Sequence, residues 1–133
     1  MSEPIFEATF ETTFMATEVF ASIASSDVPR SVAFYRQFFG REPVAAIADR
    51  YAEFRLPGLR LAIFKPSETH RTEFDRSAGA GLSVCVEVSD LEAAIERLSA
   101  IGYPPPGEIV VASHGREIYA YDPDGNRLIL HRS

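Results

Sequence analysis

The acidic residue Glu87, in a valine-rich segment, is the first candidate for a chemical role in this sequence. In residues 82–89, Glu87 lies on the same side of an alternating pattern as Ser83, and the apolar residues lie on the other side. A carboxylate on a strand needs a partner, which Arg60 or Arg127 can supply. Glu87 is therefore part of a structural ion pair, a ligand-binding group or a general base, and it is the one candidate catalytic residue.

The segment of residues 126–131 places three further side chains on one face of a strand. Arg127, Ile129 and His131 alternate with two leucines, so the three share a face. His131 has three possible roles: a solvated group near the end of the chain, a polar or acid/base group in a pocket, or a metal ligand.

The same alternation in residues 60–64 and 117–121 adds polar and aromatic side chains to the candidate site. With Phe20 they predict an amphipathic pocket for a small molecule, although the tyrosines can also be packing residues. The candidate ligand-binding residues are Phe20, Arg60, Phe64, Glu87, Glu117, Tyr119, Tyr121, Arg127, Ile129 and His131.

Three other features are expected to be less specific. Cys85 is expected to be a small buried hydrophobic residue, because no helix N-terminus or evident base adjoins it. His114 with Gly115 is expected in a hairpin at the rim of the pocket, where a surface histidine is the ordinary case. Residues 68–76 are expected to form a solvated loop that can close over a ligand.

The elements that must position these residues occur twice in the same order. Each half is predicted to contain a strand, a helix and three strands, with Asp27 and Asp90 as helix N-caps and Gly40 and Gly102 as stops. The predicted strands are residues 19–25, 43–48, 51–56, 59–64, 82–89, 108–112, 117–121 and 126–131. The apolar face of the fifth strand is expected to comprise Leu82, Val84, Val86 and Val88. An internal repeat of this length indicates two half-domains in one domain.

Composition limits the class of protein. The chain has 133 residues, a formal net charge of −6 and one cysteine, which favours a cytoplasmic protein without disulfides and disfavours nucleic acid and anionic membranes as partners. No segment is long and apolar enough to span a membrane. Residues 1–18 are expected to form an N-terminal arm or edge strand, residues 19–65 and 81–133 the two modules, and residues 66–80 a connector.

Three motifs together resemble the vicinal-oxygen-chelate superfamily of glyoxalases, extradiol dioxygenases and bleomycin- or fosfomycin-resistance proteins. They are Ser-Asp-Val-Pro-Arg-Ser-Val-Ala-Phe-Tyr at residues 26–35 with Gly40, Val-Ser-Asp-Leu at 88–91, and Asp-Pro-Asp-Gly-Asn at 122–126. The resemblance covers about residues 19–131. It implies an α+β fold in which two tandem βαβββ modules form a curled mixed sheet around a cleft, with the helices outside. It also implies a homodimer.

The resemblance further implies four metal-ligand positions, which this chain fills with Phe20, Ser83, Ala62 and Ile129. Phenylalanine, alanine and isoleucine cannot coordinate a divalent cation, and a neutral serine is a poor ligand. We therefore expect no cofactor at the family's metal site.

Three functions remain open. The first is a metal-free protein that binds a small amphipathic or aromatic molecule in its cleft, as the drug-sequestering members of the family do. The second is a metal-dependent lyase, isomerase or dioxygenase that uses a divalent metal on shifted ligands: His131, Glu87, Glu117 or Glu53. The third is a metal-free acid/base enzyme in which Glu87 acts with Arg60 or Arg127.

Overall fold

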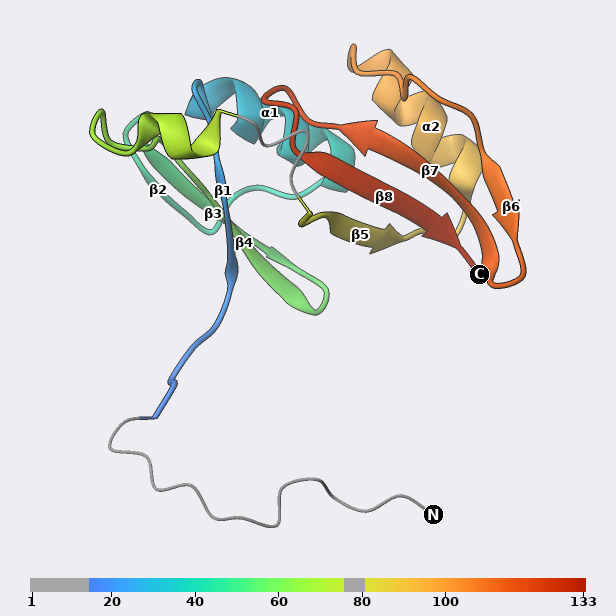
Figure 1. Cartoon of the computed structure of the whole chain (residues 1–133), viewed down its shortest axis with the longest axis horizontal. Coiled ribbons are helices and arrows are strands. Elements are labelled where there is room, and N and C mark those ends of the chain that lie inside the picture. Colours follow the sequence, from blue (N-terminus) through green and yellow to red (C-terminus); the bar gives the residue numbers. More distant parts are fainter. Residues whose placement is uncertain (1–14, 76–80) are drawn as a thin grey trace.

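Two βαβββ modules follow one another along the chain (Figure 1). The computed structural model describes residues 15–75 and 81–133. The first module contains β1 (Ala21–Ala24), α1 (Val28–Phe39), β2 (Ala45–Ile47), β3 (Tyr51–Leu56) and β4 (Leu59–Phe64). The second contains β5 (Val84–Glu87), α2 (Leu91–Ala100), β6 (Val110–Ala112), β7 (Gly115–Tyr121) and β8 (Arg127–Arg132). The predicted α+β fold is confirmed.

Each module forms its own four-stranded mixed sheet. The strand orders are β1-β4-β3-β2 and β5-β8-β7-β6, so β1 and β5 are edge strands of their sheets. β1 runs parallel to β4 and β5 runs parallel to β8, while the remaining neighbours are antiparallel. In Figure 1 the two sheets lie apart, with the helices along one side of the molecule.

The helices begin and end where the sequence predicts. The Asp27 carboxylate accepts a hydrogen bond from the backbone N–H of Arg30, and Asp90 does the same for Ala93. At the end of α1, Gly40 adopts the left-handed conformation (φ 67°) and donates its N–H to the carbonyl of Arg36.

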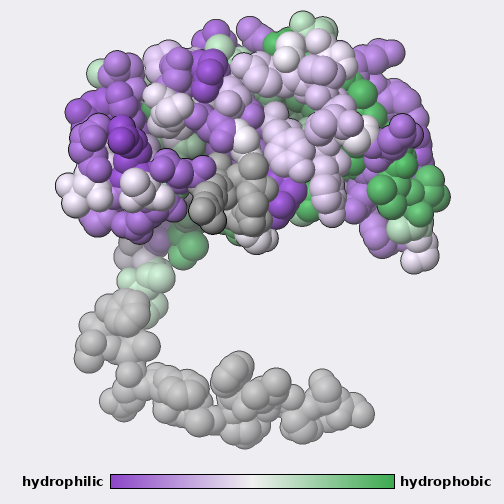
Figure 2. Space-filling view, turned by 45° about the horizontal axis from the view of Figure 1, so that its top comes forward, coloured by the Kyte–Doolittle hydropathy of each residue, from purple (hydrophilic) through white to green (hydrophobic). Residues whose placement is uncertain are grey.

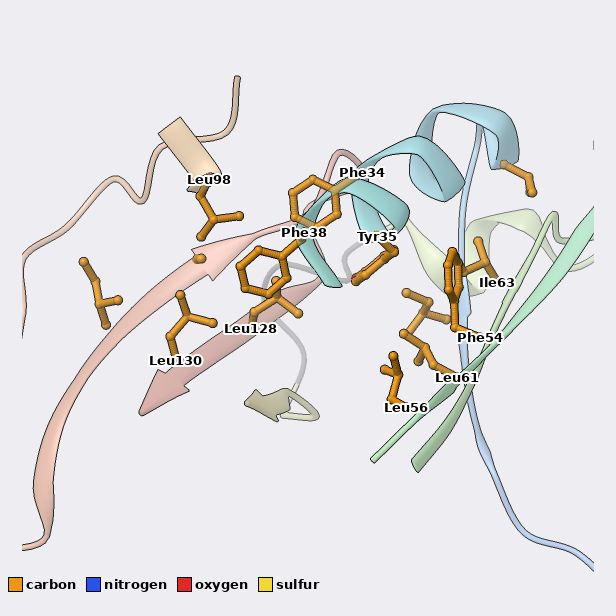
Figure 3. Packing of buried hydrophobic residues seen from close by; sticks show 14 of the residues in the cluster. Phe34, Tyr35, Phe38, Phe54, Leu56, Leu61, Ile63, Leu98, Leu128 and Leu130 are labelled. Atoms are coloured by element: carbon orange, nitrogen blue, oxygen red, sulfur yellow. The ribbon is translucent and has the colours of Figure 1, made fainter. Parts of the chain in front are cut away.

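Helix α1 joins the two halves through the hydrophobic core. Figure 3 shows Phe34 and Phe38 directed toward Leu128 and the second sheet, and Tyr35 directed toward the first sheet. Phe34 and Tyr35 are 2% and 0% exposed. Because one helix fills the space beside both sheets, the modules share a single core.

The turn between β7 and β8 adds hydrogen bonds that hold the two modules together at α1. The Asp122 carboxylate accepts hydrogen bonds from the Tyr35 hydroxyl (2.7 Å) and from the backbone N–H groups of Asp124 and Asn126 (both 2.9 Å). Asp124 in turn accepts a hydrogen bond from Ser31 of α1 at 2.6 Å. The Asp-Pro-Asp-Gly-Asn motif is therefore the part of the second module that holds the start of α1.

Several details differ from the sequence prediction. The connector contains a short 3₁₀ helix, η1 (Arg71–Phe74). Leu82 is 74% exposed and lies before β5, which begins only at Val84. Residues 15–20 form no strand, and the rest of the predicted arm lies outside the described residues. Within the described ranges, no helix is long and apolar enough to cross a membrane.

Candidate functional site

A cleft of about 460 Å³ lies between the edge strands of the two sheets. One wall is formed by β1 and the other by the start of β5, and apolar groups make up most of both walls. Its lining residues include Ser22, Phe74, Leu82, Cys85, Asn126 and Arg127. Of the predicted ligand-binding residues, Arg127 is the one that lines this cleft.

Arg127 is held in place by Ser83, the residue just before β5. Its Nε donates a hydrogen bond of 2.6 Å to the Ser83 hydroxyl. This contact fixes the guanidinium at the cleft wall, where it can meet an acidic or polar group of a ligand.

Cys85 also lines the cleft, which corrects the prediction that it is buried. It is exposed, on the face of β5 opposite the valines, where it faces the cleft. The alternating pattern therefore gave its side of the strand correctly, whereas the burial inferred from its lack of a helix N-terminus or base was wrong.

A second, more polar hollow of about 390 Å³ adjoins the cleft. The two share Ala24 and Phe74, and the second is bordered by Lys65, Arg71 and Asp124. η1 therefore lies beside both hollows, at the place where the sequence predicts a loop that can cover a ligand.

The predicted site residues of the first module form a separate group. The guanidinium of Arg60 lies over the Phe20 ring, 4.5 Å from its centroid, and also pairs with Glu18. Arg60 Nε is 3.4 Å from a carboxylate oxygen of Glu53. Arg60 thus has acidic partners in its own module, where the sequence proposed Glu87 as a partner.

Phe64 contributes an aromatic contact beside this group. Its ring meets that of Phe74 edge to face, with centroids 5.3 Å apart. Since Phe74 lines the cleft, Phe64 supports the cleft wall from behind.

The predicted residues in the middle of the second sheet share one face, as expected. Tyr119 pairs with Ile129 across β7 and β8, and Tyr121 pairs with Arg127. Tyr119 is 48% exposed, so this face is open in the single chain.

Glu87 and His131 pair directly at the far end of the same face. Nδ1 of His131 lies 2.6 Å from Oε1 of Glu87, and the other carboxylate oxygen accepts hydrogen bonds from the N–H and hydroxyl of Ser133, both at 2.8 Å. Hydrogen bonds from His131 and then Ser133 lower the pKa of Glu87 to about 2. A carboxylate with so low a pKa is a weak general base at neutral pH.

His114 completes this cluster, and it was not among the predicted site residues. It lies in the turn between β6 and β7, and its Nδ1 is 3.0 Å from Nε2 of His131. Glu117 is opposite His131 in the β7–β8 register. Ligand atoms of His114, Glu117 and His131 all lie within 4.8 Å of one another. The signal available in the sequence was Gly115, which follows His114 and is typical of a tight hairpin with a two-residue turn.

The four positions that the resemblance assigns to metal ligands lack a set of donor atoms suited to a metal ion. Ala62 is fully buried, the Phe20 ring is covered by a guanidinium, and the Ser83 hydroxyl is engaged by Arg127. Ile129 provides no donor atom. No step of chemistry can be assigned to a metal at these four positions.

Solved structures with the same architecture include two with bound molecules. A bleomycin-binding protein complexed with bleomycin gives a TM-score of 0.64 at 19% identity, over 89% of this chain and 99% of that chain. A variant of the fosfomycin resistance protein FosX from Listeria monocytogenes, complexed with Mn(II) and 1S,2S-dihydroxypropylphosphonic acid, gives 0.68 at 19% identity, over 88% and 90% of the two chains. These similarities concern the fold.

Sequence comparison gives the family directly. The chain is 30% identical over 108 residues to the metallothiol transferase FosB of Shouchella clausii strain KSM-K16, covering 80% of this chain and 73% of that protein. The model of one family matches residues 17–130, which include both modules. The chain belongs to the Glyoxalase/Bleomycin resistance protein/Dioxygenase superfamily.

Proposed function

We propose that this protein binds a small amphipathic or aromatic molecule in the cleft between β1 and β5, without a metal at the family's four ligand positions. The observation that carries the proposal is the cleft itself. Its walls are mainly apolar, and a guanidinium already oriented by Ser83 supplies one charged group. This combination is typical of sites for small amphipathic molecules.

The chemistry of the lining indicates how such a ligand is held. An apolar ring or chain can pack against Phe74 and Leu82, which are 40% and 74% exposed in the free chain. Covering these side chains removes apolar surface from water, at about 25 cal/mol per Å². A carboxylate, phosphonate or phenolic oxygen at one end can then accept hydrogen bonds from Arg127.

The molecules bound in two relatives of known structure support a binding role. One is a bleomycin-binding protein, and another was solved with Mn(II) and a phosphonic acid. This chain lacks donor atoms at Phe20, Ala62 and Ile129, which favours the function that needs no metal there. The low pKa of Glu87 likewise favours binding over catalysis by that residue.

Thermal unfolding of the full chain with a panel of ligands tests this proposal. The panel should contain bleomycin, fosfomycin and simple aromatic acids, each with and without EDTA. A ligand that binds the folded state at one hundred times its Kd stabilises it by about 2.7 kcal/mol, which raises the midpoint measurably. We expect at least one aromatic or amphipathic compound to act equally with and without EDTA.

A matched pair of variants locates the binding. Ser22→Phe places a ring in the cleft, whereas Ser99→Phe places the same ring on the exposed surface of α2. Ser22→Phe should abolish the shift and Ser99→Phe should retain it. Equal shifts in both variants, or no shift with any compound for the unaltered chain, would refute the proposal.

The expected pairing of two chains stays a prediction. We propose that exposed apolar residues on the outer strands, Val110 and Val111 at 57% and 76% exposure, are covered by a second copy. Figure 2 shows apolar surface at the end of the molecule where β6 lies. Light scattering should give twice the chain mass of 14.7 kDa; a mass of one chain at micromolar concentration would contradict pairing.

A further inference from the structure

Two histidines and a carboxylate meet at the end of the second sheet that lies away from the cleft. His131 is on β8, Glu117 is its direct neighbour on β7, and His114 is in the turn that precedes β7. At a rise of about 3.3 Å per residue, His131 lies about 13 Å beyond Arg127 along β8. The cluster therefore lies away from the proposed ligand cleft, and none of its residues occupies one of the four positions that the resemblance assigns to metal ligands.

The separation of the two imidazoles suits a shared metal ion. Nδ1 of His114 and Nε2 of His131 are 3.0 Å apart. Two nitrogens bound at about 2.0–2.1 Å lie about 2.9 Å apart when they subtend a right angle at the ion, and about 3.4 Å apart in a tetrahedral site. The Glu117 carboxylate is close enough to supply the third ligand, since all three ligand atoms lie within 4.8 Å of one another.

The backbone at Gly115 makes this approach possible. Gly115 has a φ of 137°, and a Cβ there would lie 2.4 Å from the carbonyl oxygen of Arg132 and 3.0 Å from Nε2 of His131. A side chain at this position would push the hairpin away from β8. Gly115 thus lets the turn close onto the end of β8 and brings His114 to His131.

Glu87 orients His131 from the opposite strand. It accepts a hydrogen bond at Nδ1 of His131, which places the ring proton on that nitrogen and leaves the lone pair of Nε2 directed toward His114. A carboxylate behind a histidine in this way is the usual outer support of a metal ligand. His114 must carry its own ring proton on Nε2 when its Nδ1 binds a metal.

We propose that His114, Glu117 and His131 bind one divalent transition-metal ion, such as Zn²⁺, Co²⁺ or Ni²⁺, with Glu87 as the positioning residue. Two imidazoles favour these ions over Mg²⁺ and Ca²⁺, which prefer oxygen ligands. Three protein ligands leave at least one coordination position for water or a small anion, on the side of the exposed His114. The site fastens the β6–β7 hairpin to the end of β8.

Titration of the EDTA-treated and dialysed full chain with Co²⁺ tests the site. Imidazole and carboxylate ligation should give visible absorption bands that saturate at one ion per chain, and Zn²⁺ should displace them. Isothermal titration with Zn²⁺ gives the affinity. Neither measurement depends on the ligand of the cleft, so this proposal and the proposed function can fail separately.

Variants assign the ligands. His114→Ala and Glu117→Gln should each weaken Zn²⁺ binding at least tenfold, and Glu87→Gln should weaken it about tenfold to a hundredfold while the one-to-one ratio is kept. His70→Ala is the matched control, because His70 also pairs with a glutamate, Glu73, but lies in the connector, just before η1. It should bind Zn²⁺ as the unaltered chain does.

Three results would overturn the proposal. They are no saturable Co²⁺ spectrum, unchanged Zn²⁺ affinity in both His114→Ala and Glu117→Gln, or loss of binding in His70→Ala. Because His114 is exposed in a turn, its removal should leave the circular dichroism spectrum unchanged. A loss of binding in this variant then reports the lost ligand.

Discussion

At the scale of single residues, the joint between the modules depends on two neighbouring carboxylates. Asp122 is 4% exposed, and its burial raises its pKa even though Tyr35 and Asn126 donate hydrogen bonds to it. Burial and the adjacent Asp122 also raise the pKa of Tyr35, which keeps its hydroxyl proton available for donation. The raised pKa of Tyr35 favours its donor form, whereas burial of Asp122 works against the ionised form, which the donated hydrogen bonds support.

The pKa of Asp124 is shifted in the opposite direction, below its ordinary value. Burial would raise its pKa, but hydrogen bonds from serines including Ser26 and Ser31 outweigh burial and lower it. A carboxyl group with a lowered pKa in the folded state adds stability above its unfolded pKa of about 3.8, and this contribution is lost as pH falls through the folded value.

We therefore predict that Asp124→Asn lowers the free energy of unfolding by about 1–3 kcal/mol at pH 7. The deficit relative to the unaltered chain should stay constant down to about pH 4 and narrow only at lower pH. Urea unfolding across this range measures it. The exposed Asp49→Asn variant is the control, with an expected change within about 0.5 kcal/mol. A deficit that is the same at pH 7 and pH 2 would contradict the assigned shift.

At the scale of elements, alternation and capping residues predicted most of the secondary structure. The limits of β3 and β4 agree with the predicted residues 51–56 and 59–64, because each strand is flanked by turn residues such as Pro57 and Gly58. Alternation also assigned the faces of β7 and β8 correctly. It cannot show how exposed a side chain is, which is why the exposure of Leu82 and Cys85 was not predicted.

The β6–β7 hairpin carries the next prediction. Gly115→Ala should destabilise the fold by about 1–3 kcal/mol, because alanine is strained at a φ of 137° and its Cβ would collide with the Arg132 carbonyl. Chemical unfolding gives the value. Gly107→Ala is the matched control, since its Cβ would meet nothing within 4 Å and its φ is not in the left-handed region. Equal stability of the two variants would mean that the hairpin can shift freely.

At the scale of the whole molecule, one helix links the two modules through a shared core. The Phe34 ring packs against Tyr35, Phe38 and Tyr103, with centroids 4.9, 6.2 and 5.2 Å apart. Helix α1 also contributes to the core of both sheets (Figure 3). Neither sheet can therefore keep its buried face when this helix leaves.

Phe34→Ala should accordingly reduce stability by about 3–5 kcal/mol and do so for the whole chain. Far-ultraviolet circular dichroism and tyrosine fluorescence should show one coincident transition, before and after the substitution. Phe20→Ala, at a ring that is 40% exposed, should have a smaller effect. Two separate transitions would show that the modules are independent.

The candidate site was harder to predict than the fold. Ten residues were expected in one pocket, whereas Arg127 is the one of the ten that lines the cleft, because which residues meet there depends on the angle at which the modules pack. Local alternation carries no information about that angle. His114 was missed as a member of the cluster because its approach to His131 depends on backbone contact at Gly115.

The turn of residues 122–126 limits what sequence similarity to the family can show about function. Its side chains bind the start of α1; Asn126 also lines the cleft, but no residue of the turn belongs to the cluster at the hairpin. Substitutions can therefore remove every donor atom of a catalytic centre without weakening the hydrogen bonds that hold the two modules together. A match to the motif therefore indicates that the two modules pack together as in the family. The chemistry must be established separately, by examining the residues that face the ligand.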